Sequence, residues 1–503
     1  MKTLSLVLLL LSLAPAASTQ IVFEVRADTD IAGGGLGVRS ATGDVDGDGD
    51  VDVITTTQLL RNTGDGSFAP PVDLGWAFSD DLALGLFDGD NHLDIARSDP
   101  SGAWVHLGDG NGGFDAGTLV QAKGLNPFRT IVVADVTGDG EQDLVTASGE
   151  VIAGQMEVSL LIGAGDGSFA PPALIQGPAG NLYPMEVVVG DLDDDGSPDL
   201  LLLANTLFES SLLVFQGQGG GVPVSVDFIG LGPDRALDMR LSDVTGDGDL
   251  DLLIGGLFGF ATFAGEAGLD LGPAKVWDTR PMNDGISLGD VDGDGFDDIA
   301  FTNLSTWEKV VLTGAADGSF TEVWTMTGFG SSYDGETIDF DGDGRLDLGF
   351  GAISGSGSKL YTVLRNHTYL PGEPWLDVGL GLASDEDEIV PGKPVLWADG
   401  TLGAGDEITI TMARNKAPPN QAWLILGATD LFAPFKGGVL VPSADVVIGP
   451  FTAPWTIPIE VVGTVPAGLP PGVPFWLQAW YSPSIFSELT EFAASNAVCA
   501  TTP

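Results

Sequence analysis

The sequence predicts an all-β protein, in which a seven-bladed β-propeller is followed by a small β-sandwich domain. An aspartate-rich loop recurs seven times at intervals of 42 to 56 residues, and each copy runs into an aliphatic strand. A hairpin pattern follows each loop, and the repeats stop near residue 368, where alternating strands rich in tryptophan begin. We therefore expect a signal peptide at 1–18, the propeller at 19–368 and the C-terminal domain at 369–503.

The N-terminus has the pattern of a secretory signal peptide. Lys2 precedes an apolar run from Leu4 to Leu13, and Ala14-Pro15-Ala16 offers a cleavage site with small residues. The apolar run is shorter than a bilayer requires, and no later segment is long and apolar enough to span one. The sequence thus predicts a secreted protein, extracellular or at the cell surface, without a membrane span. The single cysteine, Cys499, excludes an intrachain disulfide.

The charge of the chain limits its partners. The 503 residues carry a formal net charge of -52. Phosphates need lysine and arginine, so this charge excludes nucleic acid as a partner and favours cations instead.

The seven loops share the pattern D-x-D-x-D-G-x-x-D-aliphatic and start at residues 44, 86, 135, 191, 243, 290 and 339. Positions 1, 3, 5 and 9 carry a side-chain oxygen in nearly every copy. Position 6 is glycine or Asn91, which both tolerate a left-handed backbone. The side chains at position 7 have no chemistry in common, so this position is expected to offer its backbone carbonyl.

Such loops suit calcium, which takes six to eight oxygen ligands in flexible geometry, better than magnesium. An EF-hand is excluded, because it needs an acid at position 12 and flanking helices. Asp-Gly hairpins that bind no metal are the alternative, which the sevenfold repetition argues against. We expect about six or seven calcium ions. The expected ligands are Asp44, Asp46, Asp48, Asp50, Asp52, Asp88, Asp90, Asp94, Asp135, Thr137, Asp139, Glu141, Asp143, Asp191, Asp193, Asp195, Ser197, Asp199, Asp243, Thr245, Asp247, Asp249, Asp251, Asp290, Asp292, Asp294, Phe296, Asp298, Asp339, Asp341, Asp343, Arg345 and Asp347.

The hairpins between the loops predict the rest of each blade. "LLRNTGDGSFAPPVDL" from Leu59 and "LLIGAGDGSFAPPALI" from Leu160 each read as a strand, a Gly/Asp turn and a further strand. Each repeat then contains four short antiparallel strands, as a propeller blade does. The last repeat lacks its fourth strand. We expect Ile21–Arg26 to pair with the Tyr361–Leu364 strand and close the ring.

The loops and the "GDGSF" hairpins resemble FG-GAP/VCBS repeats of the integrin-alpha-like propeller family, from about Ile21 to Thr368. The resemblance implies calcium on the blade loops. The copy at Leu86 lacks the first carboxylate, which puts its site in doubt, and Thr137 and Thr245 imply weaker sites. Family members include adhesion receptors, lectins and modules attached to polysaccharide-active enzymes, so the fold does not settle the activity.

The C-terminal phrases "APPNQAWLILG" and "FAASNAVCATTP" resemble a module of exported bacterial proteins of the planctomycete type, with no known activity. In "FWLQAWYS", the side chains of Trp476, Gln478 and Trp480 share one face of a strand. We expect one aromatic face of this strand to be core and the other to be covered, and a sugar-stacking platform is the alternative.

No catalytic set stands out. "GISLG" at Gly285–Gly289 matches a serine-hydrolase elbow, but Gly289 aligns with the residue before each metal loop, which predicts a propeller strand. Of the three histidines, His92 lies in a metal loop, His106 precedes a hairpin turn and His367 lies at the domain junction. We expect a non-catalytic module for adhesion to, or recognition of, an extracellular protein or glycan. The alternatives are a polysaccharide lyase or glycoside hydrolase, and a lectin.

Overall fold

A computed structural model of the chain describes residues 23–31, 39–76, 79–122, 128–149, 156–175, 182–206, 209–232, 235–257, 259–265, 269, 271–282, 285–326, 331–353 and 359–366, and the ten strands of the C-terminal part. The predicted signal peptide at 1–18 and His367 lie outside these residues. Every element in the described part is a strand, and none is a helix that could cross a membrane. The chain divides into two compact units, Val25–Arg365 and a second made of Asn366–Pro503 with Met1–Glu24.

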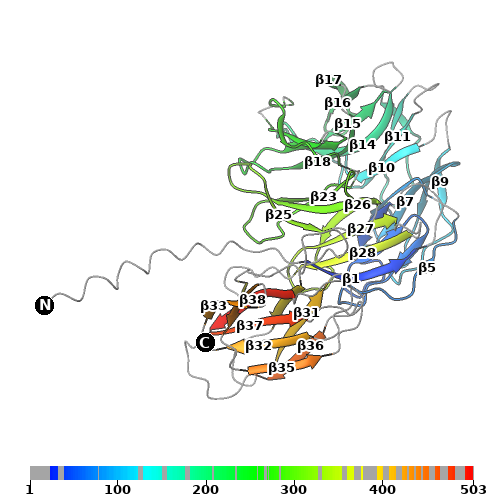
Figure 1. Ribbon diagram of the computed structural model, residues 1–503. Coiled ribbons are helices and arrows are strands. Elements are labelled where there is room, and N and C mark those ends of the chain that lie inside the picture. Colours follow the sequence, from blue (N-terminus) through cyan, green and yellow to red (C-terminus); the bar gives the residue numbers. More distant parts are fainter. Residues whose placement is uncertain are drawn as a thin grey trace. The chain divides into compact units, whose positions relative to one another are not determined.

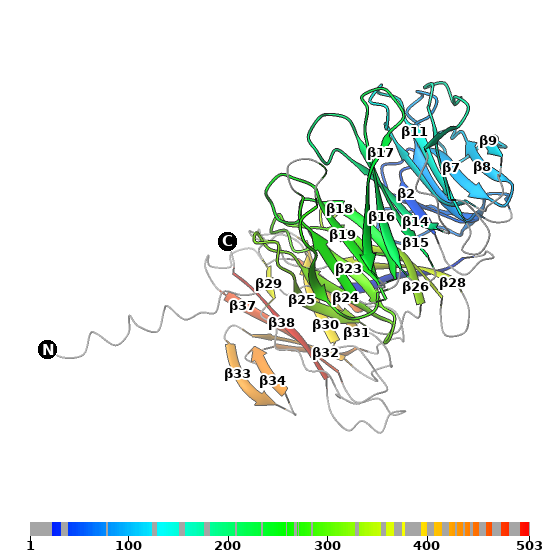
Figure 2. The same ribbon diagram turned by 90° about the horizontal axis from the view of Figure 1, so that it is seen from above.

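The first unit is a seven-bladed β-propeller, as predicted, with four hydrogen-bonded strands in each blade (Figures 1 and 2). The first three blades consist of β2 (Ser40–Gly43), β3 (Asp52–Thr55), β4 (Gln58–Leu60) and β5 (Val72–Asp73); β6 (Asp81–Gly85), β7 (Asp94–Asp99), β8 (Gly102–His106) and β9 (Thr118–Ala122); and β10 (Phe128–Ala134), β11 (Asp143–Ser148), β12 (Glu157–Leu161) and β13 (Ala173–Ile175).

The next three blades repeat this order. They consist of β14 (Tyr183–Gly190), β15 (Asp199–Asn205), β16 (Ser210–Gln216) and β17 (Val224–Gly232); β18 (Ala236–Ser242), β19 (Asp251–Gly256), β20 (Gly259–Phe263) and β21 (Lys275–Asp278); and β22 (Ser287–Gly289), β23 (Asp298–Asn303), β24 (Glu308–Thr313) and β25 (Thr321–Met326). The "GISLG" segment therefore enters the inner strand β22, as the alignment with the other loops predicts.

The seventh blade is assembled from both ends of the propeller sequence. Its order is β1 (Phe23–Asp30), β28 (Lys359–Asn366), β27 (Asp347–Ile353) and β26 (Ser331–Ile338), and the blue β1 lies beside the yellow-green β28 in Figure 1. The predicted closure by the N-terminal strand is thus confirmed from Phe23 onward. The first and seventh blades are also joined directly, by a hydrogen bond of 2.7 Å from Asn62 Nδ2 in the first blade to the Phe340 carbonyl oxygen in the seventh.

The core lies between neighbouring blades. The second and third strands of each blade are buried almost throughout, because both of their faces pack against adjacent blades. One such cluster combines Val45, Ile54 and Leu59 of the first blade with Leu82 and Ile95 of the second. This packing fixes the first strand of each blade, which is the inner one, and with it the aspartate-rich loop that follows that strand.

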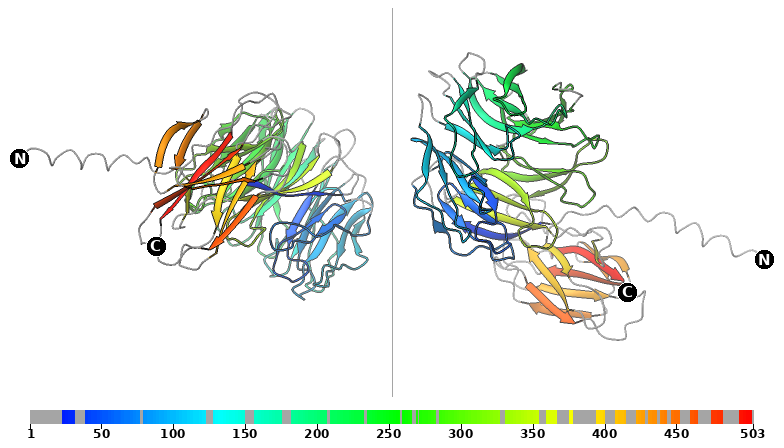
Figure 3. Two further views of the ribbon diagram at one scale, coloured as in Figure 1. Left: turned by 60° about the horizontal axis from the view of Figure 1, so that its bottom comes forward. Right: turned by 180° about the vertical axis from the view of Figure 1, so that it is seen from behind.

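The described strands of the C-terminal part form three sheets and are coloured yellow to red in Figure 3. Gln478 is fully buried, which favours a covered face, whereas the side chains of Trp476 and Trp480 lie outside the described part of the structure. The β-sandwich stays a prediction. A five-stranded sheet has the order β29-β38-β37-β32-β35, a three-stranded sheet has the order β30-β31-β36, and β33 pairs with β34. The bounds are β29 (Trp375–Asp377), β30 (Pro394–Asp399), β31 (Glu407–Arg414), β32 (Ala422–Gly427), β33 (Asp430–Phe435), β34 (Gly438–Pro442), β35 (Val446–Phe451), β36 (Ile459–Thr464), β37 (Pro474–Tyr481) and β38 (Ala493–Thr501).

Candidate metal loops

Each aspartate-rich loop connects the first and second strands of one blade. The loop that starts at Asp44 joins β2 to β3, and its position 9, Asp52, is already the first residue of β3. Position 9 begins the second strand in all seven blades, one residue earlier than the aliphatic position that the sequence suggests. The seven loops therefore have equivalent positions, one on each blade.

The backbone of the loops is left-handed at two positions. At position 6, φ lies between 63° and 99° in every copy, including Asn91, as predicted. Position 4 is also left-handed, with φ between 55° and 76°, and even Asp194 adopts this conformation. The sequence signal was present here too, since six of the seven residues at position 4 are glycine.

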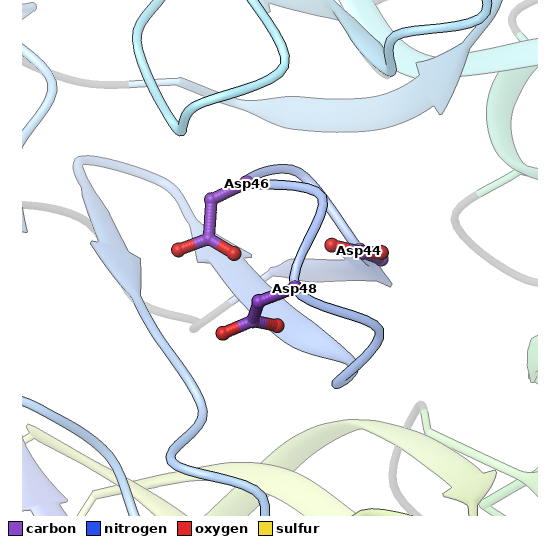
Figure 4. A group of neighbouring side chains, drawn as sticks. All are labelled: Asp44, Asp46 and Asp48. Carbon is purple, nitrogen blue, oxygen red and sulfur yellow. The ribbon is translucent and has the colours of Figure 1, made fainter.

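Four of the loops bring three aspartates close enough to share one ion, since one carboxylate oxygen of each lies within 4.8 Å of the others. Figure 4 shows one of these groups, in which Asp44, Asp46 and Asp48 project from a single short loop. A second group of this kind uses positions 1, 3 and 5, and two more use positions 1, 3 and 9. These three groups are Asp290, Asp292 and Asp294; Asp191, Asp193 and Asp199; and Asp339, Asp341 and Asp347.

Among the described residues, no such group forms in the loops that start at 86, 135 and 243. These are the three loops in which Leu86, Thr137 or Thr245 replaces an aspartate at position 1 or 3. The remaining predicted ligands of these loops are in place on the same backbone, but they do not supply three clustered carboxylates.

Position 3 carries oxygens that are buried and have no hydrogen-bond partner. They are Asp46 Oδ1, Thr137 Oγ1 and Thr245 Oγ1. Burial raises the pKa of the Asp143 carboxyl, and the nearby Thr137 hydroxyl acts in the opposite direction, although it makes no hydrogen bond of regular geometry. A buried polar atom without a partner is costly. An oxygen-binding cation at the loop centre would satisfy these atoms, so the residues present fit such an ion.

The carboxylates at positions 1 and 5 are held by the loop itself. In six loops, one oxygen at position 1 accepts the N–H of position 6 at 2.8–3.0 Å. In all seven loops, Oδ1 at position 5 accepts the N–H of position 7 at 2.8–3.0 Å. The side chains are thus oriented by backbone donors before any ion binds.

The aspartate at position 9 has a second role that the sequence did not reveal. It is at most 2% exposed in every blade. In six blades its Oδ1 accepts the N–H of the first or second residue after the third strand, at 2.7–2.9 Å. Its Oδ2 accepts an N–H from position 2 or 3 at 2.8–3.2 Å. We call this residue the clamp, because it ties the start of the loop to the end of the third strand.

Burial is the main reason why the clamp carboxyls are hard to ionise without a cation. It raises the pKa of Asp52 to about 6 and that of Asp298 to about 7, although backbone N–H donors act in the opposite direction. The other loop carboxylates add to the rise by like-charge repulsion. A divalent cation would relieve both the repulsion and part of the cost of burial.

In three loops, the carboxylate at position 3 contacts a side chain from the end of the third strand or from just after it. Gln216 Nε2 donates to Asp193 Oδ2 at 2.8 Å, and Arg61 Nε lies 3.6 Å from Asp46 Oδ2. Arg365 pairs with Asp341 in the seventh blade. In the same loop, the position 7 side chain of Arg345 pairs with Asp343 at 2.7 Å. The carboxylates of the seventh loop are thus partly neutralised by the chain itself.

A separate charged group lies on the inner strands of the propeller. Arg39, just before β2, pairs with Glu186 on β14 at 3.8 Å. Because these residues come from the first and fourth blades, the pair spans the centre of the ring. Burial raises the pKa of Glu186 to about 8, with contributions of opposite sign from Arg39 and Arg240 and of the same sign from Asp238 and Asp81.

The two described histidines are engaged. His106 is buried, its Nε2 accepts from Arg97 Nε at 2.9 Å, and its Nδ1 donates to the Asp115 carbonyl oxygen at 3.1 Å. Burial lowers the pKa of His106, which keeps the ring neutral. His92 Nδ1 lies 3.0 Å from Asp90 Oδ2, within its loop. The hydrogen-bond partners of His92 and His106 include no serine, threonine or cysteine side chain that could act as a nucleophile.

Comparison with known proteins supports the repeat assignment. Residues 87–146, 150–202 and 290–350 match the model of the FG-GAP-like repeat. No curated protein matches the chain. A lectin from Agrocybe aegerita that recognises non-reducing terminal N-acetylglucosamine is 20% identical, with 61% of this chain and 80% of the lectin covered and a TM-score of 0.42.

An exo-β-1,3-galactanase from Phanerochaete chrysosporium is also similar. Its structure with galactose is 9% identical, covering 73% of this chain and 94% of the enzyme with a TM-score of 0.30. A structure of the same enzyme with β-1,3-galactotriose is 10% identical, covering 95% and 100% with a TM-score of 0.32. The matched segments and the topology together show that this chain carries FG-GAP-like repeats within a seven-bladed β-propeller.

Proposed function

We propose that the protein is an exported, calcium-stabilised propeller that serves recognition or adhesion without catalysis. Its partner is an extracellular or cell-surface protein or glycan. The observation that carries the proposal is the set of four clustered aspartate groups on equivalent loops of the ring. The signal-peptide pattern at residues 1–18 supports export.

Calcium is the cation that the donor set favours. The candidate ligands are almost all carboxylate, hydroxyl and carbonyl oxygens, without cysteine, and calcium prefers such oxygens in number. In the first loop, Asp44, Asp46 and Asp48 would hold the ion. The ion supplies positive charge to a crowded acidic loop, and the loop residues supply the oriented oxygens. The predicted six or seven ions remain part of the proposal.

Binding screens test the recognition role. The purified mature protein is applied to a glycan array and to a panel of cell-surface proteins, with calcium and with chelator. The expected result is calcium-dependent binding to one partner class, and a glycan partner makes the protein a lectin. Asp290→Asn combined with Asp292→Asn should weaken binding in proportion to lost calcium. Absence of binding to both panels with calcium present would contradict the proposal.

A second candidate, a polysaccharide lyase or glycoside hydrolase, is favoured by the charged group near the axis. A carboxyl kept protonated by burial, such as Glu186, can act as a proton donor, and Arg39 and Arg240 could bind an acidic sugar. Against it, Asp238 accepts the N–H groups of Gly285 and Ile286, which ties that carboxylate to the neighbouring blade.

Turnover on a panel of acidic polysaccharides decides between the two candidates. The non-catalytic proposal predicts no product with the wild type or with Glu186→Gln. Product formation by the wild type that Glu186→Gln abolishes, while the variant keeps its melting temperature, would establish the enzyme instead.

A further inference from the structure

We propose that the residue at the end of the third strand, just before the N–H donor of the clamp, sets the calcium affinity of its loop, with arginine lowering it and glutamine preserving it. The loop that starts at Asp191 then fills at lower calcium than the loop that starts at Asp339. This inference rests on the proposed calcium binding, and it assigns a role to Arg365 and Gln216.

The position of these residues follows from the clamp. Gly217 donates its N–H to the clamp Asp199 at 2.8 Å, which brings the end of the third strand against the loop. Gln216 is the residue just before this donor, and Arg61 has the same place before Asn62, which donates to Asp52. Arg365 occupies the equivalent place in the seventh blade.

All three side chains reach the same atom of the loop. Gln216, Arg61 and Arg365 each approach Oδ2 of the position 3 aspartate. The other oxygen is turned toward the loop, where Asp193 Oδ1 and Asp341 Oδ1 accept the N–H of position 5 and Asp46 Oδ1 has no hydrogen-bond partner. The third strand thus holds one oxygen of the carboxylate and leaves the other for an ion.

The residue before the clamp's donor varies between blades, and two blades with aspartate at position 3 carry Leu107 and Thr313 there. Where position 3 is threonine, at Thr137 and Thr245, the residue before the clamp's donor is the apolar Ile162 or Ala264. A hydroxyl needs no charged partner, so a donor there would have no function. The arginines and the glutamine occur in blades whose position 3 is aspartate.

Charge distinguishes arginine from glutamine. Glutamine donates a hydrogen bond to the carboxylate and arginine forms an ion pair with it, and such outer contacts tune a metal site. Only the guanidinium also repels a divalent cation and neutralises the carboxylate in its absence. The seventh loop carries this furthest, because Arg365 pairs with Asp341 and Arg345 with Asp343.

The test exchanges the two residue types between two loops of the full chain. Calcium binding is measured by equilibrium dialysis over buffered free calcium for the wild type, Arg365→Gln and Gln216→Arg. We expect Arg365→Gln to move one binding step to roughly tenfold lower calcium, and Gln216→Arg to move one step roughly tenfold higher. The total number of ions should stay the same at saturation.

Thermal unfolding in chelator gives a second readout. Removal of the guanidinium leaves the acidic loop without its internal counter-charge, so Arg365→Gln should melt below the wild type in chelator and level with it at saturating calcium. A glutamine at position 365 should donate to Asp341 as Gln216 donates to Asp193. The variant therefore removes the charge while it keeps a donor for the carboxylate.

The outcomes separate this inference from the proposed function. If the wild type binds calcium and Arg365→Gln leaves the curve unchanged or weakens one step, the inference is overturned and the calcium propeller stands. If the wild type binds no calcium at millimolar concentration, both are wrong.

Discussion

Asp143, the clamp of the third blade, offers the cleanest separation of a structural role from a metal role. Its loop carries Thr137 at position 3 and forms no cluster of three carboxylates among the described residues. Asp143 is fully buried, and its Oδ2 accepts the N–H groups of Val136 and Thr137 at 3.0 Å, while Oδ1 accepts that of Gly163 at 2.8 Å. The change considered is Asp143→Asn.

The magnitude follows from these bonds. Asparagine has one acceptor oxygen, which can keep the two donors on the Oδ2 side. Its NH₂ group then faces the Gly163 N–H. Both the NH₂ group and the Gly163 N–H are then buried donors without an acceptor, at a cost of about 1–3 kcal/mol each. Removal of a carboxyl whose pKa is raised by burial returns part of this cost. The net expectation is a loss of about 2–4 kcal/mol of stability.

The assay is urea unfolding of wild type, Asp143→Asn and Asp139→Asn, each with calcium and with chelator. Asp139 is exposed in the same loop, and asparagine can still accept the Glu141 N–H, so this control should change stability by no more than about 0.5 kcal/mol. The comparison is decided in chelator, where neither side chain can act as a calcium ligand, and there only the clamp variant should be strongly destabilised. A loss that is seen only with calcium, or that matches the control, would refute the clamp.

Two further perturbations test the axis and the blade edges. The raised pKa of Glu186 means that the folded state keeps a proton that the unfolded chain has lost between pH 4.5 and about 8, so this residue's contribution to stability falls as pH rises through that window. Glu186→Gln should gain at least ~1 kcal/mol over the wild type between pH 5.5 and pH 9 in thermal unfolding; a constant difference would contradict the buried acid. Gly259 has φ +106°, and an added Cβ would lie 1.7 Å from the Asp278 carbonyl oxygen. In denaturant unfolding, Gly259→Ala should lower the free energy of unfolding by roughly 3 kcal/mol or more. The control Gly248→Ala, at φ +99° with open space around it, should lower it by about 1 kcal/mol. Equal losses of stability would show that the close contact at Gly259 does not matter.

The propeller could be predicted because its loop pattern occurs seven times in the sequence. A single loop such as that at Asp44 is ambiguous, whereas seven aligned copies separate ligand columns from the left-handed position and from the aliphatic residue that enters a strand. The same counting exposed the missing strand of the last blade, which predicted the pairing of the N-terminal strand with β28.

Side-chain contacts between residues far apart in the sequence could not be predicted, because these residues share no pattern. Asp52 looks like one more ligand in its loop, and only the folded blade places the Asn62 N–H against it. The Arg39–Glu186 pair links strands from the first and fourth blades, and no periodicity connects them. Equally, Arg365 reads as the end of a strand until the clamp geometry brings it to Asp341.

The central claim is that the aspartate loops hold calcium in the folded protein, and thermal unfolding of the mature chain with a count of bound ions tests it most directly. Ions that bind only the folded state must raise its stability. The account predicts a large fall of the melting temperature in chelator and at least the four ions that the aspartate clusters could hold. An unchanged melting temperature, with no bound metal, would contradict it.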